Sequence, residues 1–224
     1  MSELDEKRIQ ERAYQIKCRD KALAFLRRCR EANIPDQYWR INEKTFSSLL
    51  FPEYYGSKEK AKEFSKAIYH DPSNLFKIPF ILIDGGDVMS RNKAGFALLF
   101  RLITCDKFGI YKGCKDLVHK FQSIKSTEAV LRNDAVDDLK GYDILFINEF
   151  DRGLFKPHFE TGDFFDELLE HRCNREKPTI ISFTNPVGSI ENNKNDKSCG
   201  IYMADLCVQE KPSEEVLRIR VRKR

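Results

Sequence analysis

The stretch IPFILIDGGD, at residues 78–87, decides the fold class of this chain. It begins with a mostly apolar run of strand length and ends with residues that favour a turn. Residues 93–104 then carry apolar side chains at helical spacing. A strand, a glycine-bearing loop and a helix in this order predict the opening of a βαβ unit.

The same alternation recurs farther along the chain. Residues 109–111 and 142–147 predict two more strands, which are followed by helices over residues 114–124 and 164–175, and residues 179–183 predict another strand. Because these strands are apolar throughout, helices are expected to cover both faces of the sheet, as in parallel α/β proteins. The predicted fold is α/β, with a parallel sheet of about five strands.

Two further elements are predicted at the ends of the chain. Residues 3–32 have the apolar spacing of a long helix that ends before Pro35, because proline cannot continue a helix. We therefore divide the chain into a basic helical arm at residues 1–33 and an α/β core at residues 34–224. The arm either packs on its own core or docks on a partner or a neighbouring subunit. Residues 216–221 predict a terminal edge strand.

The composition excludes several classes of protein. With 224 residues, of which 41% are hydrophobic and 33% charged, the chain fits one full-sized core and not a disordered or low-complexity protein. No apolar stretch approaches the roughly 20 residues of a membrane helix. The amino terminus is charged from the start, so we expect a cytoplasmic protein. The seven cysteines contain no C-x-x-C pair, and no metal site is predicted.

Polar residues stand where the predicted strands end. In a parallel sheet, ligands bind at the carboxyl ends of the strands. Here those ends carry Asp84-Gly85-Gly86, Asn148-Glu149 and Thr184-Asn185. A loop and helix after the first strand, an acidic pair after the second and a polar residue after the third have the layout of a phosphate-loop ATPase.

On these motifs the chain resembles the AAA+ ATPase core of helicase loaders of the DnaC/DnaI type and the related IstB transposition helpers. The resemblance covers roughly residues 34–222. DILFINEF at residues 143–150 is similar to the family's Walker B strand, and KPTIISFTN at residues 177–185 is similar to its sensor strand. IPDQYW at residues 34–39 looks like the segment that precedes the family's core. The resemblance implies a P-loop NTPase core with an N-terminal helical extension.

The expected phosphate loop departs from the pattern G-x-x-x-x-G-K-[ST]. Gly85 and Gly86 are the candidate loop glycines, and Lys93 stands at the position of the loop lysine. Asn92 replaces the second glycine, and Ala94 replaces the hydroxyl residue that binds Mg²⁺. By resemblance, all five are nucleotide-binding positions.

The expected metal site and trans-acting charge also depart from the family's pattern. Asn148 replaces the aspartate that holds the metal, although Glu149 keeps the position of the water-activating carboxylate, here taken as vestigial. Asn185 is the polar sensor position. Residues 200–206, where the resemblance expects an arginine finger, contain no arginine. Three losses together remove the main sources of rate enhancement for phosphoryl transfer.

The resemblance and these departures predict a pseudo-ATPase of DNA replication, from a phage or a mobile element. It binds a replicative helicase or another AAA+ subunit, and single-stranded DNA, with little or no ATP hydrolysis and no required cofactor. The alternative is an active helicase loader or transposition helper that uses ATP or ADP with Mg²⁺ through Lys93 and Glu149. A third hypothesis is a loader mimic that inhibits loading. The sequence leaves the oligomeric state open.

A cluster of basic residues closes the chain. Because phosphate contacts require no sequence code, these residues are predicted to bind nucleic acid; the alternative is an edge strand whose charges prevent aggregation. The residues are Arg218, Arg220, Arg222, Lys223 and Arg224. A second basic set lies on the first predicted helix and suits either nucleic acid or an acidic protein surface.

Overall fold

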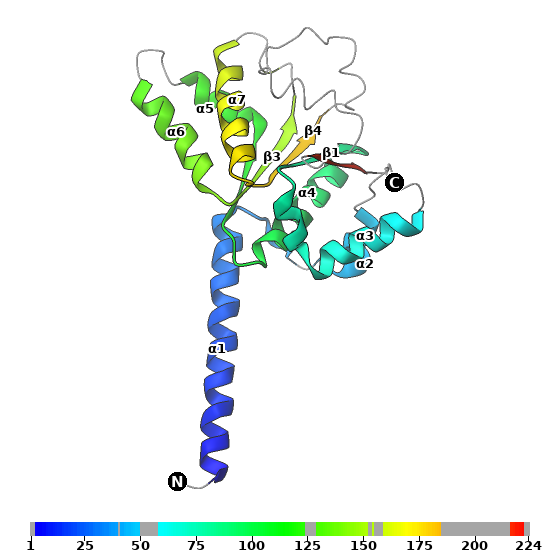
Figure 1. The fold of residues 1–224 in the computed structure, drawn as a ribbon, viewed down its shortest axis with the longest axis vertical. Helices are drawn as coiled ribbons and strands as arrows, with labels where there is room; N and C mark the ends of the chain where they lie inside the picture. Colours follow the sequence, from blue (N-terminus) through cyan, green and yellow to red (C-terminus); the bar gives the residue numbers. More distant parts are fainter. Residues whose placement is uncertain are drawn as a thin grey trace.

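A five-stranded parallel sheet organises the molecule, as the sequence predicts (Figure 1). The computed structural model describes residues 3–39, 41–49, 58–123, 129–151, 154, 159–184 and 216–221. The strands, in the spatial order β2-β3-β4-β1-β5, are β2 (Gly109–Gly113), β3 (Ile144–Phe150), β4 (Thr179–Phe183), β1 (Phe80–Gly85) and β5 (Val216–Val221). Every neighbouring pair is parallel.

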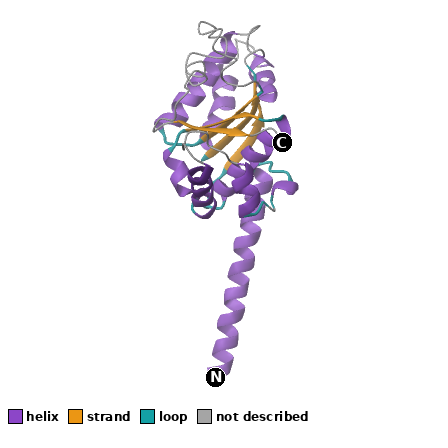
Figure 2. Ribbon diagram, turned by 90° about the vertical axis from the view of Figure 1, so that its right-hand side faces the viewer, coloured by secondary structure: helices purple, strands orange, loops and turns teal. Residues whose placement is uncertain are grey.

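Helices cover both faces of the sheet (Figure 2). One face packs against α5 (Cys114–Ser123), α6 (Ala129–Gly141) and α7 (Phe159–Asn174). The other packs mainly against α4 (Val88–Ile103) and is joined by the end of α1 (Glu3–Glu31). The smaller elements η1 (Asp36–Tyr38), α2 (Glu43–Leu49), α3 (Lys58–His70) and η3 (Pro72–Lys77) lie between α1 and β1 in the chain.

The alternation of side chains along each strand explains the two apolar layers. In β1, Phe80 and Leu82 belong to the cluster with α5 and α7, whereas Ile81 and Ile83 belong to the cluster with α4. All four side chains are fully buried. A strand that is apolar at every position is therefore the expected form for this sheet.

The close approach of α4 to β3 depends on Gly95. A Cβ atom at this position would lie 2.1 Å from Cζ of Phe146, which no real contact allows. The ring of Phe146 meets Phe96 edge to face, with ring centroids 5.3 Å apart. Gly95 thus sets the distance between the central helix and the sheet.

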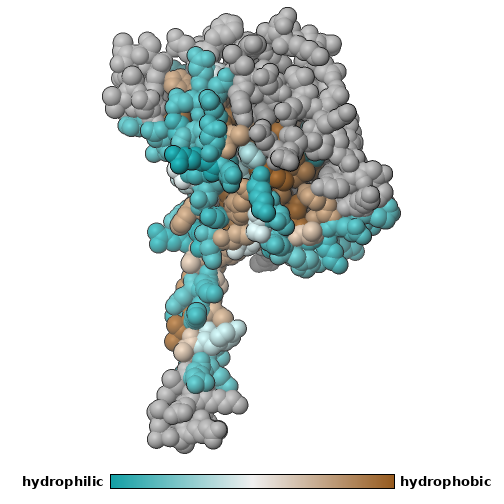
Figure 3. Space-filling view, in the orientation of Figure 1, coloured by the Kyte–Doolittle hydropathy of each residue, from teal (hydrophilic) through white to brown (hydrophobic). Residues whose placement is uncertain are grey.

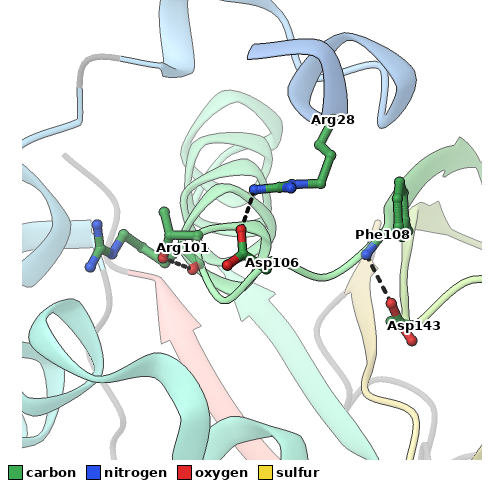
Figure 4. A network of polar contacts seen from close by, with 6 residues as sticks. Arg28, Arg101, Asp106, Phe108 and Asp143 are labelled. Atoms are coloured by element: carbon green, nitrogen blue, oxygen red, sulfur yellow. Dashed lines mark hydrogen bonds and ion pairs between the residues drawn. The ribbon is translucent and has the colours of Figure 1, made fainter. Parts of the chain in front are cut away.

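Only the last turns of α1 pack on the core, and the rest of the helix projects away from it (Figures 1 and 2). Phe25 meets Phe100 of α4 with ring centroids 5.2 Å apart, and Cys29 is fully buried. Figure 4 shows Arg28 reaching from α1 to Asp106, with 2.6 Å between Nη2 and Oδ1. The arm is therefore anchored at its carboxyl end.

The structure differs from the sequence-based prediction in several of its helices. Helix α7 begins at Phe159 and not at residue 164. The helix after β1 begins at Val88 and not at residue 93, and helix α6, at Ala129–Gly141, was not predicted. The predicted edge position of residues 216–221 is confirmed, since β5 pairs only with β1 among the described strands. Within the described residues, no helix is both long enough and apolar enough to span a membrane.

Candidate functional site

The connection between β1 and α4 is too short to be a phosphate-binding loop. β1 ends at Gly85 and α4 begins at Val88, so only Gly86 and Asp87 join them. Both glycines have left-handed backbone conformations, with φ of 73° and 55°, which makes the turn abrupt. A phosphate cradle requires several consecutive backbone N–H groups that are free of helix bonds, and this turn does not provide them.

Asp87 is the reason that α4 begins early. Its Oδ1 accepts a hydrogen bond from the backbone N–H of Ser90 at 2.6 Å, as an N-cap residue does. This hydrogen bond, with a smaller contribution from the nearby Arg91 and Lys93 cations, lowers the pKa of Asp87. The carboxylate is therefore ionised, and it caps the amino terminus of α4.

Early helix formation places the other predicted phosphate-loop residues inside α4. Asn92, Lys93 and Ala94 lie in its second turn. Ala94 is fully buried in the apolar layer between α4 and the sheet, while Asn92 and Lys93 are half-buried. The prediction that a loop begins the nucleotide site is wrong in its local geometry, although whether these residues contact a nucleotide stays a prediction.

Arg91 occupies the carboxyl edge of the sheet between β1 and β4. The residue is only 5% exposed. Its Nη1 donates to the carbonyl oxygens of Gly85 at 2.9 Å and Gly86 at 3.1 Å, and Nη2 donates to that of Thr184 at 3.4 Å. The guanidinium thus joins two strand ends where the resemblance expects a phosphate group.

The electrostatic surroundings of Arg91 are acidic. Burial lowers the pKa of the guanidinium, while the carboxylates of Glu149, Asp87 and Asp84 oppose that shift. Within the described part of the chain, its Nε has no hydrogen-bond partner. The edge therefore holds its own cation beside the carboxylates that would otherwise attract one.

Asn148 and Glu149 lie near the end of β3, and their side chains have opposite orientations. Asn148 is buried, its Oδ1 accepts from Oγ of Ser182 at 2.5 Å, and its Nδ2 lies 3.5 Å from the hydroxyl of Tyr111. Glu149 is exposed, has a left-handed backbone with φ of 55°, and donates its N–H to Oγ of Ser182 at 3.0 Å. The amide of Asn148 is thus engaged by residues of the two neighbouring strands, β4 and β2.

Arg218 is not part of an exposed nucleic-acid surface, which corrects the sequence-based prediction. It is 4% exposed, and its Nε and Nη2 donate to Oδ2 of the fully buried Asp84 at 3.0 and 2.5 Å. A buried carboxylate without a cation would be strongly destabilising, so Asp84 requires this partner.

The remaining predicted site residues lie largely beyond the described structure. Arg220 lies in β5, in register with Asp84 of β1. Asn185, residues 200–206, Arg222, Lys223 and Arg224 lie outside the described residues. The predicted roles of Arg220, Arg222, Lys223, Arg224 and Asn185 stay predictions.

Magnesium-bound ATP does not fit the residues described at this edge. The connection offers no cradle, Arg91 fills the space between two strand ends, and Asn148 is hydrogen-bonded to its neighbours. Within the described residues, no group of three or more His, Cys, Asp or Glu side chains is placed to hold a metal ion. We therefore derive no catalytic step through a metal.

Arg91 is the site residue that the sequence reasoning missed. A signal was present: Asp87 is a favoured N-cap residue and Ser90 follows it by three, which marks a helix start at residue 88. A helix that starts there places Arg91 at the end of its first turn, beside the end of β1. The family pattern favoured a loop and so concealed this assignment.

The five-stranded parallel sheet, with helices packed on both faces and polar side chains at its carboxyl edge, defines a parallel α/β fold. Among solved structures, the chain is similar to "Replication initiator DnaA bound to AMPPCP and single-stranded DNA", with a TM-score of 0.56 and 13% identity over 83% of this chain and 50% of that chain. It is also similar to DnaI, with a TM-score of 0.53 and 15% identity over 84% of this chain and 94% of that chain. AMPPCP-bound DnaA from Aquifex aeolicus has a TM-score of 0.51 and 12% identity, over 83% of this chain and 51% of that chain.

These similarities establish the fold. The chain spans about half the length of the DnaA structures it matches and nearly all of the DnaI structure. No protein-family model matches the sequence, and no curated protein sequence matches it.

Proposed function

We propose that this chain is a degenerate relative of AAA+ helicase loaders, encoded by a phage or a mobile element and active in the cytoplasm. It binds a replicative helicase or another AAA+ subunit during DNA replication, with little or no ATP hydrolysis. The similarity in fold to DnaI and DnaA supports the general kind of protein. The carboxyl edge of the sheet supports the loss of turnover.

The position of Arg91 is the observation that carries the proposal. A buried guanidinium hydrogen-bonded to the ends of β1 and β4 holds the edge together without a phosphate group. The two-residue connection from Gly85 to Val88 removes the cradle in which a triphosphate would lie. Both features favour a protein that uses this fold as a scaffold for binding.

Two surfaces are proposed for the partners. The basic arm at residues 1–33 contacts the helicase or the AAA+ subunit, and the core at residues 34–224 supports it. The end of the chain contacts the phosphates of single-stranded DNA, through residues that no longer include Arg218. These residues are Arg220, Arg222, Lys223 and Arg224.

A titration of the purified full chain with a fluorescent ATP analogue, with and without Mg²⁺, tests the proposal. We expect no Mg²⁺-dependent binding and no phosphate release. Capture of the cognate replicative helicase by the tagged chain at low salt is expected in the same preparation. Absence of capture with the arm intact would contradict the partner assignment.

The second candidate function is an active helicase loader or transposition helper, and Glu149 is the observation that favours it. This exposed carboxylate is held on a left-handed backbone, and such strain is frequent at functional positions. If the alternative holds, Mg-ATP turnover will be clear and will be lost in Lys93→Ala and Glu149→Gln. The exposed Lys115→Ala serves as the matched control and is expected to have no effect.

A further inference from the structure

The part of α1 that projects from the core carries large apolar side chains that are exposed to solvent. Every residue from Gln10 to Ala24 is exposed, including Ile16 at 52% and Leu23 at 57%. Figure 3 shows apolar surface on this part of the arm. Exposed aliphatic side chains that follow a helical repeat indicate a surface that another helix covers.

These side chains form one stripe along the helix. Ile16 and Leu23 are seven residues apart and so lie on nearly the same face, and the sequence has a third apolar residue seven positions earlier, at residue 9. At about 100° per residue, Phe25 lies on the opposite side from Ile16. Phe25 is the residue that packs on the core, so the stripe faces away from it. A second helix can therefore lie along the stripe without meeting the body.

When two copies of α1 run antiparallel, positive side chains of one copy lie level with negative side chains of the other. A two-fold axis at Ile16 places residue i of one copy level with residue 32 − i of the other. Ile16 then meets its own copy, and Leu23 lies level with residue 9 of the other helix. Arg12 and Asp20 lie about 40° to either side of Ile16, so Arg12 of each copy lies level with Asp20 of the other on the face that carries Ile16. No height from residue 10 to residue 22 brings two like charges together. By the same angle, Glu11 and Lys21 lie about 140° from Ile16 and take no part in the contact.

A parallel pair in register would have the reverse property. Each charge would then face itself, so Arg12 would meet Arg12 and Asp20 would meet Asp20, which is destabilising. Asp20 has an ion contact of 3.7 Å with Arg19 on its own helix, and both side chains are largely exposed. Such a contact contributes little, so Asp20 remains available to a partner.

We propose that α1 pairs with α1 of a second copy of this chain, antiparallel and centred on Ile16. The contact is isologous, since the same surface is used by both copies. About 25 residues overlap, a length of about 37 Å at 1.5 Å per residue. With an apolar contact at Ile16 and an Arg12–Asp20 pair on each side of it, the dimer is weak and depends on salt. The pairing does not rest on the proposed function, and the side of α1 that carries Tyr14 stays open to a helicase.

Sedimentation equilibrium of the full chain over a range of concentrations tests the pairing. We expect a reversible dimer that Ile16→Asp weakens by at least tenfold, because the two carboxylates would meet at the two-fold axis. Tyr14→Asp is the matched control: Tyr14 is 70% exposed but lies on the other side of the helix, so no change is expected. Circular dichroism checks that both variants keep their helix content.

Exchanging the charges at positions 12 and 20 tests whether these two residues face each other in the dimer. Arg12→Glu and Asp20→Lys alone are each expected to weaken the dimer about fivefold, because each pair occurs twice. The double variant restores the wild-type dissociation constant only if these two residues face each other. A wild-type chain that stays monomeric up to about 100 µM, or a double variant no tighter than the single ones, would overturn the proposal. A monomer that captures helicase through Ile16 would assign the stripe to that protein instead.

Discussion

Two buried arginines lie at opposite ends of the sheet, and their surroundings differ. Arg172 of α7 lies at the amino ends of β3 and β4 and is fully buried, whereas Arg91 of α4 lies at the carboxyl ends of β1 and β4. Burial lowers the pKa of Arg172 to about 9, against the opposing charge of Asp143, so the group is still a cation at neutral pH. Each guanidinium therefore carries a charge out of water.

The two guanidinium groups differ in how many of their N–H groups have a hydrogen-bond acceptor. All five N–H donors of Arg172 have acceptors at distances between 2.8 and 3.4 Å, namely the hydroxyl of Thr179 and the carbonyls of Leu139, Tyr142, Asp143 and Pro178. Arg91 has three carbonyl contacts and an Nε without a partner in the described chain. At the amino end of the sheet, every N–H group of Arg172 therefore has an acceptor. The carboxyl end has a cation whose Nε–H lacks an acceptor in the described chain, and beside it the exposed carboxylate of Glu149.

The largest effect on stability is expected at the amino end of the sheet, around Arg172. Arg172→Met removes the buried donor from the carbonyl of Leu139 and from the hydroxyl of Thr179, two residues that are inaccessible to water. The carbonyl of Pro178 keeps its hydrogen bond from the N–H of Leu145. We expect the free energy of unfolding to fall by about 3 kcal/mol or more, measured by urea denaturation. Arg175→Ala, an exposed arginine on the same segment, is the control and should change stability by less than about 0.5 kcal/mol. Equal losses of unfolding free energy in the two variants would mean that the hydrogen bonds of Arg172 do not stabilise the amino end of the sheet.

A smaller loss is expected at the carboxyl edge. In Arg91→Met, water can reach the carbonyls of Gly85 and Gly86, since both residues are half-buried. We expect a loss of about 1 kcal/mol in the same denaturation measurement. A loss as large as that of Arg172→Met would show that the two ends are equivalent, and the comparison would fail.

The smallest effect compares backbone strain at the two ends. Glu149 at the carboxyl edge and Glu176 at the amino edge both have left-handed backbones, with φ of 55° and 51°. Glycine at either position relieves about 1 kcal/mol of strain and loses part of this in chain entropy, so each variant should be more stable by about 0.5 kcal/mol. Thermal unfolding measures the gain, and alanine at the same positions is the control, because it keeps Cβ.

A functional measurement separates the two strained positions. Glu149→Gly should change any activity of the carboxyl edge, whereas Glu176→Gly should change stability alone. Glu176 ends α7 through a hydrogen bond from its N–H to the carbonyl of Cys173 at 3.0 Å, which is the role of a helix C-terminal residue. If neither variant is stabilised, strain is not stored at these positions.

Much of the fold was predictable because strands buried on both faces must be apolar at every position. Phe80–Ile83, Ile144–Ile147 and Thr179–Phe183 were all found from this pattern. Helix α6 was missed because its apolar spacing is weak, and α4 was begun too late because a family pattern outweighed the N-cap at Asp87. The arm was predicted as a helix, but its exposure was left open.

The sequence by itself determined the order of the strands and most of the helices along the chain, and which polar residues follow the apolar runs of the strands. These follow from local periodicity and residue chemistry, which act over a few neighbouring positions. Only the tertiary structure decided that Arg218 is buried against Asp84, 134 positions away in the chain, and that Arg91 joins β1 to β4. Such contacts depend on which strands become neighbours, because the burial of a charge is set by the packing around it and not by the residues beside it in sequence.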